Sequence, residues 1–193
     1  MIKVKCTLFK VFGMFTRRGD TGETDLASRV RVGKDSPIVE VQGVIDELNA
    51  FIGQALVLTK WEDIRKDLFK IQNDLFVLGE DVSTGGKGRV VTREMIDYLE
   101  DRVNVLRKEI GKIELFVIPG GTLEATSVHI ARTVSRRLER RIVFANHYTD
   151  INKNVLIYAN RLSSLLFMIA MVSNKRQNVE EKIWPIHLPK DGS

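Results

Sequence analysis

The chain has 193 residues, 44% hydrophobic and 28% charged, which is the balance of a globular protein with one domain or two small ones. Its single cysteine, Cys6, excludes an intrachain disulfide and a thiolate metal cluster. The net charge of +5 favours a polyanionic partner, either a nucleic acid or a nucleoside triphosphate.

No apolar run is long enough to cross a bilayer. The longest spans residues 165–172, well short of the ~18 residues that a transmembrane helix needs. Residues 1–6 lack the apolar stretch and cleavage site of a signal peptide. We therefore expect a cytoplasmic protein with no membrane contact.

The first 35 residues are expected to lie outside the main fold. Residues 1–13 are apolar and basic, which suggests a short strand or an ordered arm. Residues 14–35 carry glycines and small polar side chains and are predicted to form a loop.

Apolar residues that recur at steps of three and four predict five helices in the rest of the chain. The first begins with Ser36 as N-cap and Pro37 at the first helical position, and runs to about residue 56. The second covers about 61–82, the third follows Thr92, the fourth covers about 123–146 after a Thr122 cap, and the fifth covers about 152–173.

Five helices with mostly short connections predict an all-α fold, an antiparallel five-helix bundle. We interpret residues 1–193 as a single domain. It divides into an N-terminal arm at 1–13, a loop at 14–35, the helix bundle at 36–173 and an irregular tail at 174–193.

The densest chemical signal is the arginine-rich run 132–141 in the fourth helix. At ~100° per residue, Arg132, Arg136 and Arg140 share one stripe beside Glu139. Arginine keeps its charge and presents a fork of donors that matches phosphate oxygens. The stripe indicates a phosphate site, but a solvated basic face or an arginine-rich interface has the same pattern. The opposite side is predicted to enter the core at Val134, Leu138 and Ile142.

A second signal is the loop Thr16-Arg-Arg-Gly-Asp-Thr-Gly-Glu-Thr24. Glycines, hydroxyls and basic side chains let a backbone approach an anion closely, as a phosphate-binding loop requires. The G-x-x-x-x-G-K-S/T spacing of a Walker A motif is absent, also from the linker at 85–88. An ordinary polar loop is the alternative.

Polar groups interrupt two apolar helical stretches, at residues 46–49 and 158–161. Buried polar groups need partners, and Asp46 is a natural partner for an arginine of the fourth helix. The histidines have no metal-like spacing and form no catalytic relay, so we interpret them as packed or exposed residues. They are His129, His147 and His187.

Five segments in order resemble one family. They are Thr16–Thr24, Val44-Ile-Asp-Glu-Leu-Asn-Ala-Phe-Ile-Gly53, Phe116-Val-Ile-Pro-Gly-Gly121, Ala131-Arg-Thr-Val-Ser-Arg-Arg-Leu-Glu-Arg-Arg141 and Tyr158-Ala-Asn-Arg-Leu-Ser-Ser-Leu-Leu-Phe167. Over about residues 14–173, the chain resembles the PduO-type ATP:cob(I)alamin adenosyltransferases. The resemblance implies a five-helix bundle that assembles as a homotrimer and binds ATP at the subunit interfaces.

The resemblance also implies roles for individual residues. Arg136 and Arg140 resemble catalytic cations, and Phe116 resembles the aromatic that packs under the corrin ring. Asp46 and Arg132 resemble an intersubunit salt bridge. The positions that resemble ATP contacts are Thr16, Arg17, Arg18, Gly19, Thr24, Asp25, Lys34, Arg136, Arg137, Glu139, Arg140 and Asn160. Two positions depart from the family pattern, with Asp25 where a small hydroxyl residue is common and Leu138 where alanine is usual.

The implied reaction transfers the 5′-deoxyadenosyl group of ATP to cob(I)alamin and releases adenosylcobalamin and triphosphate. Cob(I)alamin is itself the nucleophile, so the protein needs cations for the leaving triphosphate rather than an acid–base pair. Mg²⁺ with the ATP phosphates is expected among those cations, with protein ligands unassigned. An apolar wall at Phe116 would exclude an axial ligand and ease the reduction of Co(II).

The implied partners are ATP, cobalamin, further copies of the chain and a cob(II)alamin reductase, with an adenosylcobalamin-dependent enzyme as a further candidate. No nucleic acid is expected. Two other classes of protein fit the residues. One is a helical nucleic-acid-binding protein that uses the basic stripe, and the other is a trimer that binds ATP without catalysis.

Overall fold

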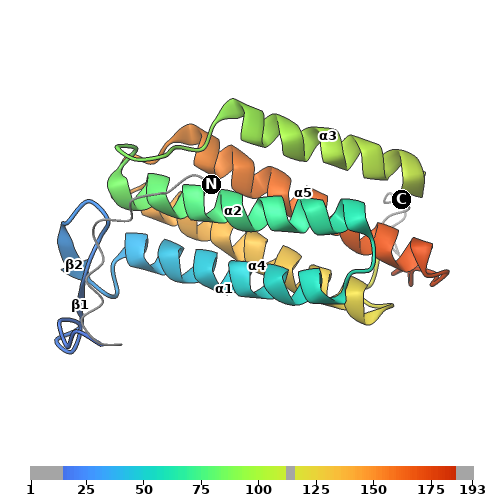
Figure 1. The fold of residues 1–193 in the computed structure, drawn as a ribbon, viewed down its shortest axis with the longest axis horizontal. Helices are drawn as coiled ribbons and strands as arrows, with labels where there is room; N and C mark the ends of the chain where they lie inside the picture. Colours follow the sequence, from blue (N-terminus) through green and yellow to red (C-terminus); the bar gives the residue numbers. More distant parts are fainter. Residues whose placement is uncertain (1–14, 112–115, 186–193) are drawn as a thin grey trace, which may run out of the picture.

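The computed structural model describes residues 15–111 and 116–185. The predictions for residues 1–13, Cys6, His187 and the end of the tail lie outside this part of the chain. Five helices form a bundle (Figure 1), as the spacing of apolar residues predicted. They are α1 (Pro37–Leu58), α2 (Glu62–Thr84), α3 (Arg93–Ile110), α4 (Leu123–Ala145) and α5 (Lys153–Arg176).

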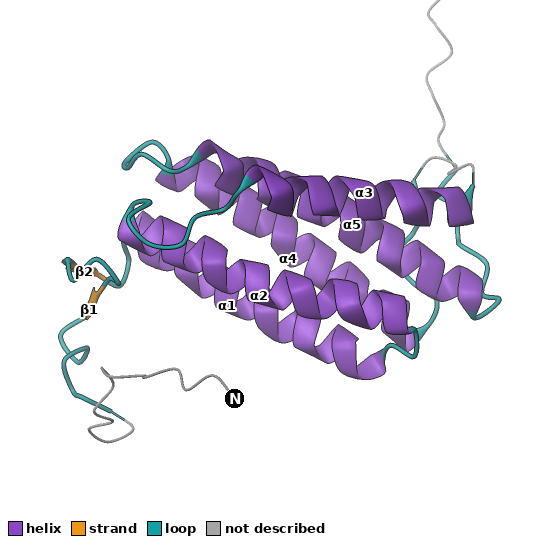
Figure 2. Ribbon diagram, turned by 45° about the horizontal axis from the view of Figure 1, so that its top comes forward, coloured by secondary structure: helices purple, strands orange, loops and turns teal. Residues whose placement is uncertain are grey.

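Each helix packs against particular neighbouring helices. α1 contacts α2 and α4, while α5 contacts α4 and α3. The pairs α1–α2, α1–α4 and α4–α5 run antiparallel, whereas α3 and α5 run in the same direction (Figure 1). The parallel pair follows from the chain path, because successive helices alternate in direction and α3 and α5 are separated by one helix. Figure 2 shows α4 at the back of the bundle, between α1 and α5.

The helix ends follow local chemistry. Pro37 occupies the first turn of α1 after Ser36, although the Ser36 side chain makes no capping hydrogen bond. Thr122 caps α4, because its side chain accepts a hydrogen bond from the backbone N of Ala125 at 3.1 Å. Helix α5 continues past Ser173 to Arg176.

The core is the set of apolar residues that the three-and-four spacing predicted. Each of the five helices contributes leucines with no exposed surface, and burial of one such side chain stabilises the fold by about 1.5–3 kcal/mol. They include Leu48, Leu68, Leu99, Leu138 and Leu166. By length and composition α5 is apolar enough to cross a membrane, but 67% of its most apolar window is buried inside the bundle, as in a core helix of a globular protein.

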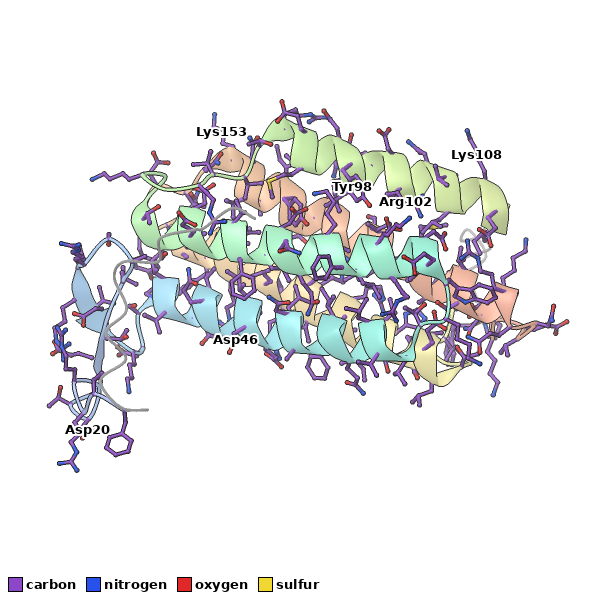
Figure 3. The ribbon with its side chains drawn as sticks, viewed as in Figure 1. Asp20, Asp46, Tyr98, Arg102, Lys108 and Lys153 are labelled. Atoms are coloured by element: carbon purple, nitrogen blue, oxygen red, sulfur yellow. The ribbon has the colours of Figure 1, made fainter. Side chains whose placement is uncertain are left out.

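A polar seam joins α2 to the rest of the bundle. Three α2 aspartates at seven-residue spacing are buried, and each accepts a hydrogen bond: Asp67 from Tyr98 (2.6 Å), Asp74 from Tyr158 (3.0 Å) and Asp81 from Asn152 (2.7 Å). Figure 3 shows Tyr98 and Arg102 between α3 and α2. Because a buried carboxylate without a partner is strongly destabilising, these bonds set which helix faces meet.

Two short paired segments replace stretches that were predicted to be irregular. β1 (Glu23–Asp25) pairs antiparallel with β2 (Arg31–Gly33) beyond the start of α1, outside the bundle (Figures 1 and 2). The tail pairs with the segment before α4 through a bridge between Val117 and Ile183. Strands of this length are too short to produce a readable alternation of apolar and polar residues.

Candidate active site

The arginine stripe lies on α4. Val134, Leu138 and Ile142 are buried, so the opposite side of the helix faces out of the bundle. Arg136 and Arg140 are exposed on that side. Among the described residues, no carboxylate forms an ion pair with either guanidinium, whereas Arg141 pairs with Glu40 of α1 at 3.1 Å. Arg136 and Arg140 are therefore exposed α4 cations that are available to an external anion.

The other predicted nucleotide residues on α4 and α5 are held by partners. Asn160 of α5 donates from Nδ2 to Glu139 at 2.8 Å, which brings these two predicted ATP contacts together. Arg137 forms an ion pair with Glu47 of α1. The sequence suggested Asp46 as the carboxylate of α1 that pairs with an arginine of α4. Within one chain, Glu47 forms such a pair instead.

A cleft of about 330 Å³ opens between α3, α4 and α5. Its lining combines three guanidinium groups and two serine hydroxyls with apolar side chains: Val103, Arg107, Arg132, Arg136, Ser163, Ser164, Phe167 and Met168. Burial and the nearby Arg136 lower the pKa of Arg132, yet an arginine stays charged at any working pH. Such a lining suits a ligand that has both an anionic part and a flat apolar part.

His129 lies beside Arg132 and is packed, as predicted, with only 3% of its surface exposed. Arg132 donates from Nε to its Nδ1 at 3.3 Å. Burial, and to a smaller extent the charge of Arg132, lowers the pKa of His129 to about 4, so the imidazole is neutral at neutral pH. Within residues 15–111 and 116–185, no group of three His, Cys, Asp or Glu side chains is placed to hold a metal ion.

The predicted phosphate loop at 16–24 leads into the first strand of the pair, β1. The Lys34 amine lies against Gly19, where a Cβ atom would come within 3.0 Å of Nζ, so a side chain at this position would require the lysine to shift. Arg18 pairs with Asp25 at 2.9 Å. The remaining predicted ATP contacts of this region lie on the same projecting segment: Thr16, Arg17 and Thr24.

Arg31 organises this loop, and the sequence reasoning missed it. It pairs with Glu23 at 2.9 Å and lies 3.6 Å from Asp25, its cross-strand neighbour. It also donates to the backbone oxygen of Arg18 at 2.6 Å. Asp25, which departs from the family pattern, thus has two loop arginines as neighbours within the chain.

The loop and the arginine stripe are two separate regions within one chain. No hydrogen bond or ion pair found in the described residues joins 15–35 to α4. The loop projects past the start of α1, with Asp20 at its far end (Figure 3). Asp46 lies in a groove of about 260 Å³ between α1 and α2, whereas Arg132 lines the cleft on the other side of α4. The predicted Asp46–Arg132 pair is not formed within one chain.

Phe116 lies outside the core. Its side chain is 66% exposed, and its backbone is in the left-handed region with φ of 52°. Trp184 of the tail donates its backbone N–H to the Phe116 oxygen at 2.8 Å. A phenylalanine among Leu115, Val117 and Ile118 could also pack the bundle, but this exposure does not fit that alternative.

The comparisons with known proteins bear directly on this arrangement. Residues 14–173 match the family described as cobalamin adenosyltransferase. The corrinoid adenosyltransferase of Bacillus subtilis (strain 168) is 40% identical over 172 residues, which cover 86% of this chain and 89% of the relative. The chain belongs to the cobalamin adenosyltransferase family. A cobalamin adenosyltransferase from Cupriavidus metallidurans is 38% identical over 172 residues, covering 88% of this chain and 92% of that protein.

Solved structures of the cobalamin adenosyltransferase family share the fold. One is a variant of the PduO-type ATP:corrinoid adenosyltransferase from Lactobacillus reuteri, complexed with cobalamin and ATP. It has a TM-score of 0.85 and 29% identity, and the match covers 89% of this chain and 96% of that chain. Another variant of that enzyme, complexed with ATP, has a TM-score of 0.84 and 30% identity. That match covers 89% of this chain and 100% of the other chain. The family resemblance of the five sequence segments is confirmed.

For this cobalamin adenosyltransferase, sequence reasoning also missed two residues that line the cleft, Arg107 and Phe167. Phe167 stood in a quoted motif, and its place four residues after Ser163 on α5 puts both on one face. Arg107 carried no signal, because an arginine in the last turn of α3 is also what a helix C-terminus favours.

Proposed function

We propose that this chain transfers the 5′-deoxyadenosyl group of ATP to the cobalt of cob(I)alamin at sites formed between copies of the chain. It is an ATP-dependent corrinoid adenosyltransferase. In the reaction the electron pair of Co(I) forms the bond to C5′ of the ribose. The C5′–O bond breaks, and triphosphate leaves with the electron pair of that C5′–O bond. The protein supplies no nucleophile and needs no proton transfer at carbon.

The protein's main chemical task is to stabilise charge on the leaving triphosphate. Arg136 and Arg140 are proposed for this role because they are exposed on α4 and have no carboxylate partner among the described residues. Lys34 is proposed as a third cation, carried by the loop. Mg²⁺ would accompany the phosphates, and we assign it no protein ligand, since it is commonly held by substrate phosphates and water.

The remaining ATP contacts are proposed on the two regions that carry these cations. The Asn160–Glu139 hydrogen bond of 2.8 Å supports a joint role for those two side chains. The close approach of Lys34 to Gly19 supports an anion-binding role for the loop. The proposed set on the loop is Thr16, Arg17, Arg18, Gly19, Thr24, Asp25 and Lys34, and the set on the helices is Arg136, Arg137, Glu139, Arg140 and Asn160.

A homotrimer is proposed because one chain separates the two halves of this site. The outward face of α4 exposes apolar side chains beside the arginines, namely Ile130, Val143 and Phe144. The groove around Asp46 also contains Glu80, and the cleft around Arg132 contains two further arginines, so the two hollows are complementary in charge. A head-to-tail contact between unlike surfaces closes into a ring of three when each copy is rotated by one third of a turn from the next. Asp46 and Arg132 would then pair across the subunit boundary.

Phe116 is proposed to lie against the lower face of the corrin ring. Its high exposure leaves the ring free to contact a ligand. An apolar wall there would keep water and the dimethylbenzimidazole base off cobalt, which makes Co(II) easier to reduce. A cob(II)alamin reductase and an adenosylcobalamin-dependent enzyme are the partners we propose before and after this step, in the cytoplasm.

The observation that carries the proposal is the pair of exposed α4 arginines beside a cleft that also has apolar walls. Arg136→Ala should lower kcat/KM for ATP by ~10²-fold, as loss of a charge-stabilising donor does. Arg141→Ala is the matched control, because its pair with Glu40 is half exposed and worth little. Near-normal kinetics in the Arg136 variant would exclude the role. ATP binding without turnover, or steeply salt-dependent DNA binding, would instead support the two other protein classes.

A further inference from the structure

Hydrogen bonds connect the segment that carries Phe116 to the tail and to the end of α5. On one side, its backbone pairs with the tail, through Ile118 N to Lys182 O at 2.7 Å and Trp184 N to Phe116 O at 2.8 Å. On the other side, the turn at Gly120 and Gly121 leads into α4. A side chain that joins this turn to the tail can therefore contribute to the position of Phe116.

Asn174, near the C-terminal end of α5, makes that connection. Its side chain has no exposed surface. Oδ1 accepts a hydrogen bond from Thr122 N at 2.9 Å, while Nδ2 donates to Gly120 O at 3.0 Å and to Glu181 Oε1 at 2.9 Å. The backbone oxygen of Asn174 also accepts from Val179 N at 3.0 Å. One amide therefore binds the turn before α4 and the first part of the tail.

The geometry around Asn174 is specific for an amide and for a neighbouring glycine. Nδ2 faces two oxygens, from Gly120 and Glu181, and only a donor satisfies both. A Cβ atom on Gly121, whose φ is +95°, would collide with the Asn174 amide. Burial raises the pKa of Glu181, and the bond from Asn174 opposes that rise, so the carboxylate depends on the amide.

We propose that Asn174 is a positioning residue that sets the place of Phe116 against the corrin ring. This inference rests on the proposed role of Phe116 and adds a residue that acts only through it. Asn174 lies in the buried end of the bundle and needs no contact with either substrate. Loss of its amide would free the turn and the tail together, and Phe116 would no longer hold the axial position of cobalt closed.

The test compares Asn174→Asp with Ser173→Ala. Asn174→Asp keeps the shape of the side chain and the oxygen that accepts from Thr122 N. It replaces Nδ2 by a carboxylate oxygen, which faces the oxygens of Gly120 and Glu181. The second removes a different buried hydrogen bond of the same helix end, Ser173 Oγ to Glu124 at 2.9 Å. We expect Asn174→Asp to lower the rate from cob(II)alamin by about tenfold, the loss expected when buried partners are left unsatisfied. The rate from pre-reduced cob(I)alamin and the Kd for ATP should change little, and Ser173→Ala should leave the ratio of the two rates unchanged.

A double variant separates positioning from general damage. In a Phe116→Ala background, Asn174→Asp should add no further loss, since the two changes act on one element. Additive losses, or equal losses in both assays, would overturn the proposal. If the Asn174 variant does not fold, Glu181→Ala removes only the side-chain hydrogen bond from Asn174 to the tail. The same criteria then apply to that variant. If Phe116→Ala alone shows equal losses, the positioning role falls with the corrin role. Whether the chain catalyses adenosyl transfer is tested separately, by the assay of the wild-type protein.

Discussion

The replacement of Phe116 by alanine separates a ligand-contacting role from a packing role. About one third of this side chain is buried, since 66% is exposed. Complete burial of a phenylalanine side chain is worth about 1.5–3 kcal/mol, so the truncation should cost no more than about 1 kcal/mol of stability. The φ of 52° is equally unfavourable for phenylalanine and alanine and adds no difference. For a chain of this size, that loss lowers Tm by about 2–4 °C.

The catalytic effect should be unequal. Without the ring, water or the dimethylbenzimidazole base can return to the axial position of cobalt, and reduction of Co(II) becomes harder. We expect activity to collapse when the assay starts from cob(II)alamin and a reductant, and to survive in part with pre-reduced cob(I)alamin. The Kd for ATP should change little, because the proposed phosphate contacts lie on other segments. Equal losses in both assays together with a Tm drop above about 10 °C, as loss of a core phenylalanine would cause, would refute the reasoning.

Three further predictions concern assembly and stability. Asp46→Ala should loosen the trimer, because a severed buried ion pair leaves one charge uncompensated at a cost of ~3–5 kcal/mol; sedimentation checks this, and a monomeric wild type at micromolar concentration would contradict it. Hydrogen bonds from Arg176 lower the pKa values of Asp63 and Glu109. The stability that these carboxylates contribute is therefore present above their unfolded pKa of about 4 and is lost as pH falls through the lowered folded values. Arg176→Gln should flatten that acid loss in urea titrations. Thr122→Ala should cost about 1 kcal/mol through loss of the α4 cap, and an unchanged urea midpoint would argue against the cap.

The helices could be predicted from the sequence because their packing repeats along the chain. Each helix buries a stripe of leucine, isoleucine and valine, and that stripe has the period of the helix itself. The polar seam was missed, although the spacing of Asp67, Asp74 and Asp81 by seven residues places all three on one face. An aspartate next to an apolar stripe usually remains in solvent. Its burial is revealed only by its partners, which lie on α3, on α5 and at the N-cap of α5.

The short paired segments could not be predicted. The bridge between Val117 and Ile183 joins residues far apart in the chain, and each partner is a single residue. Likewise, the amide of Asn174 holds Gly120 and Glu181 through contacts that leave no periodic signal. Such contacts depend on where the helix ends meet, which local sequence does not encode.

The candidate site was predicted as two motifs, and the sequence carried no information on their distance. Arg136 and Arg140 lie on an outward face of α4, as the helical spacing indicated. The segment that carries Lys34 precedes α1, and Figure 2 shows the strand pair of this segment beyond the start of α1, outside the bundle. A site that is completed by another copy of the chain cannot be recognised from spacing within one chain.

The most direct test of a site shared between copies is complementation between two inactive variants. Lys34→Ala removes a cation from the loop half, and Arg136→Ala removes one from the helix half. Each variant alone, and mixed trimers prepared by co-expression, are supplied anaerobically with ATP and cob(I)alamin, and formation of the Co–C bond is followed. In a head-to-tail ring, about a quarter of the sites in an equal mixture combine two intact halves, so the mixed trimers should regain about that share of wild-type activity. A mixture no more active than the separate variants would contradict the shared site.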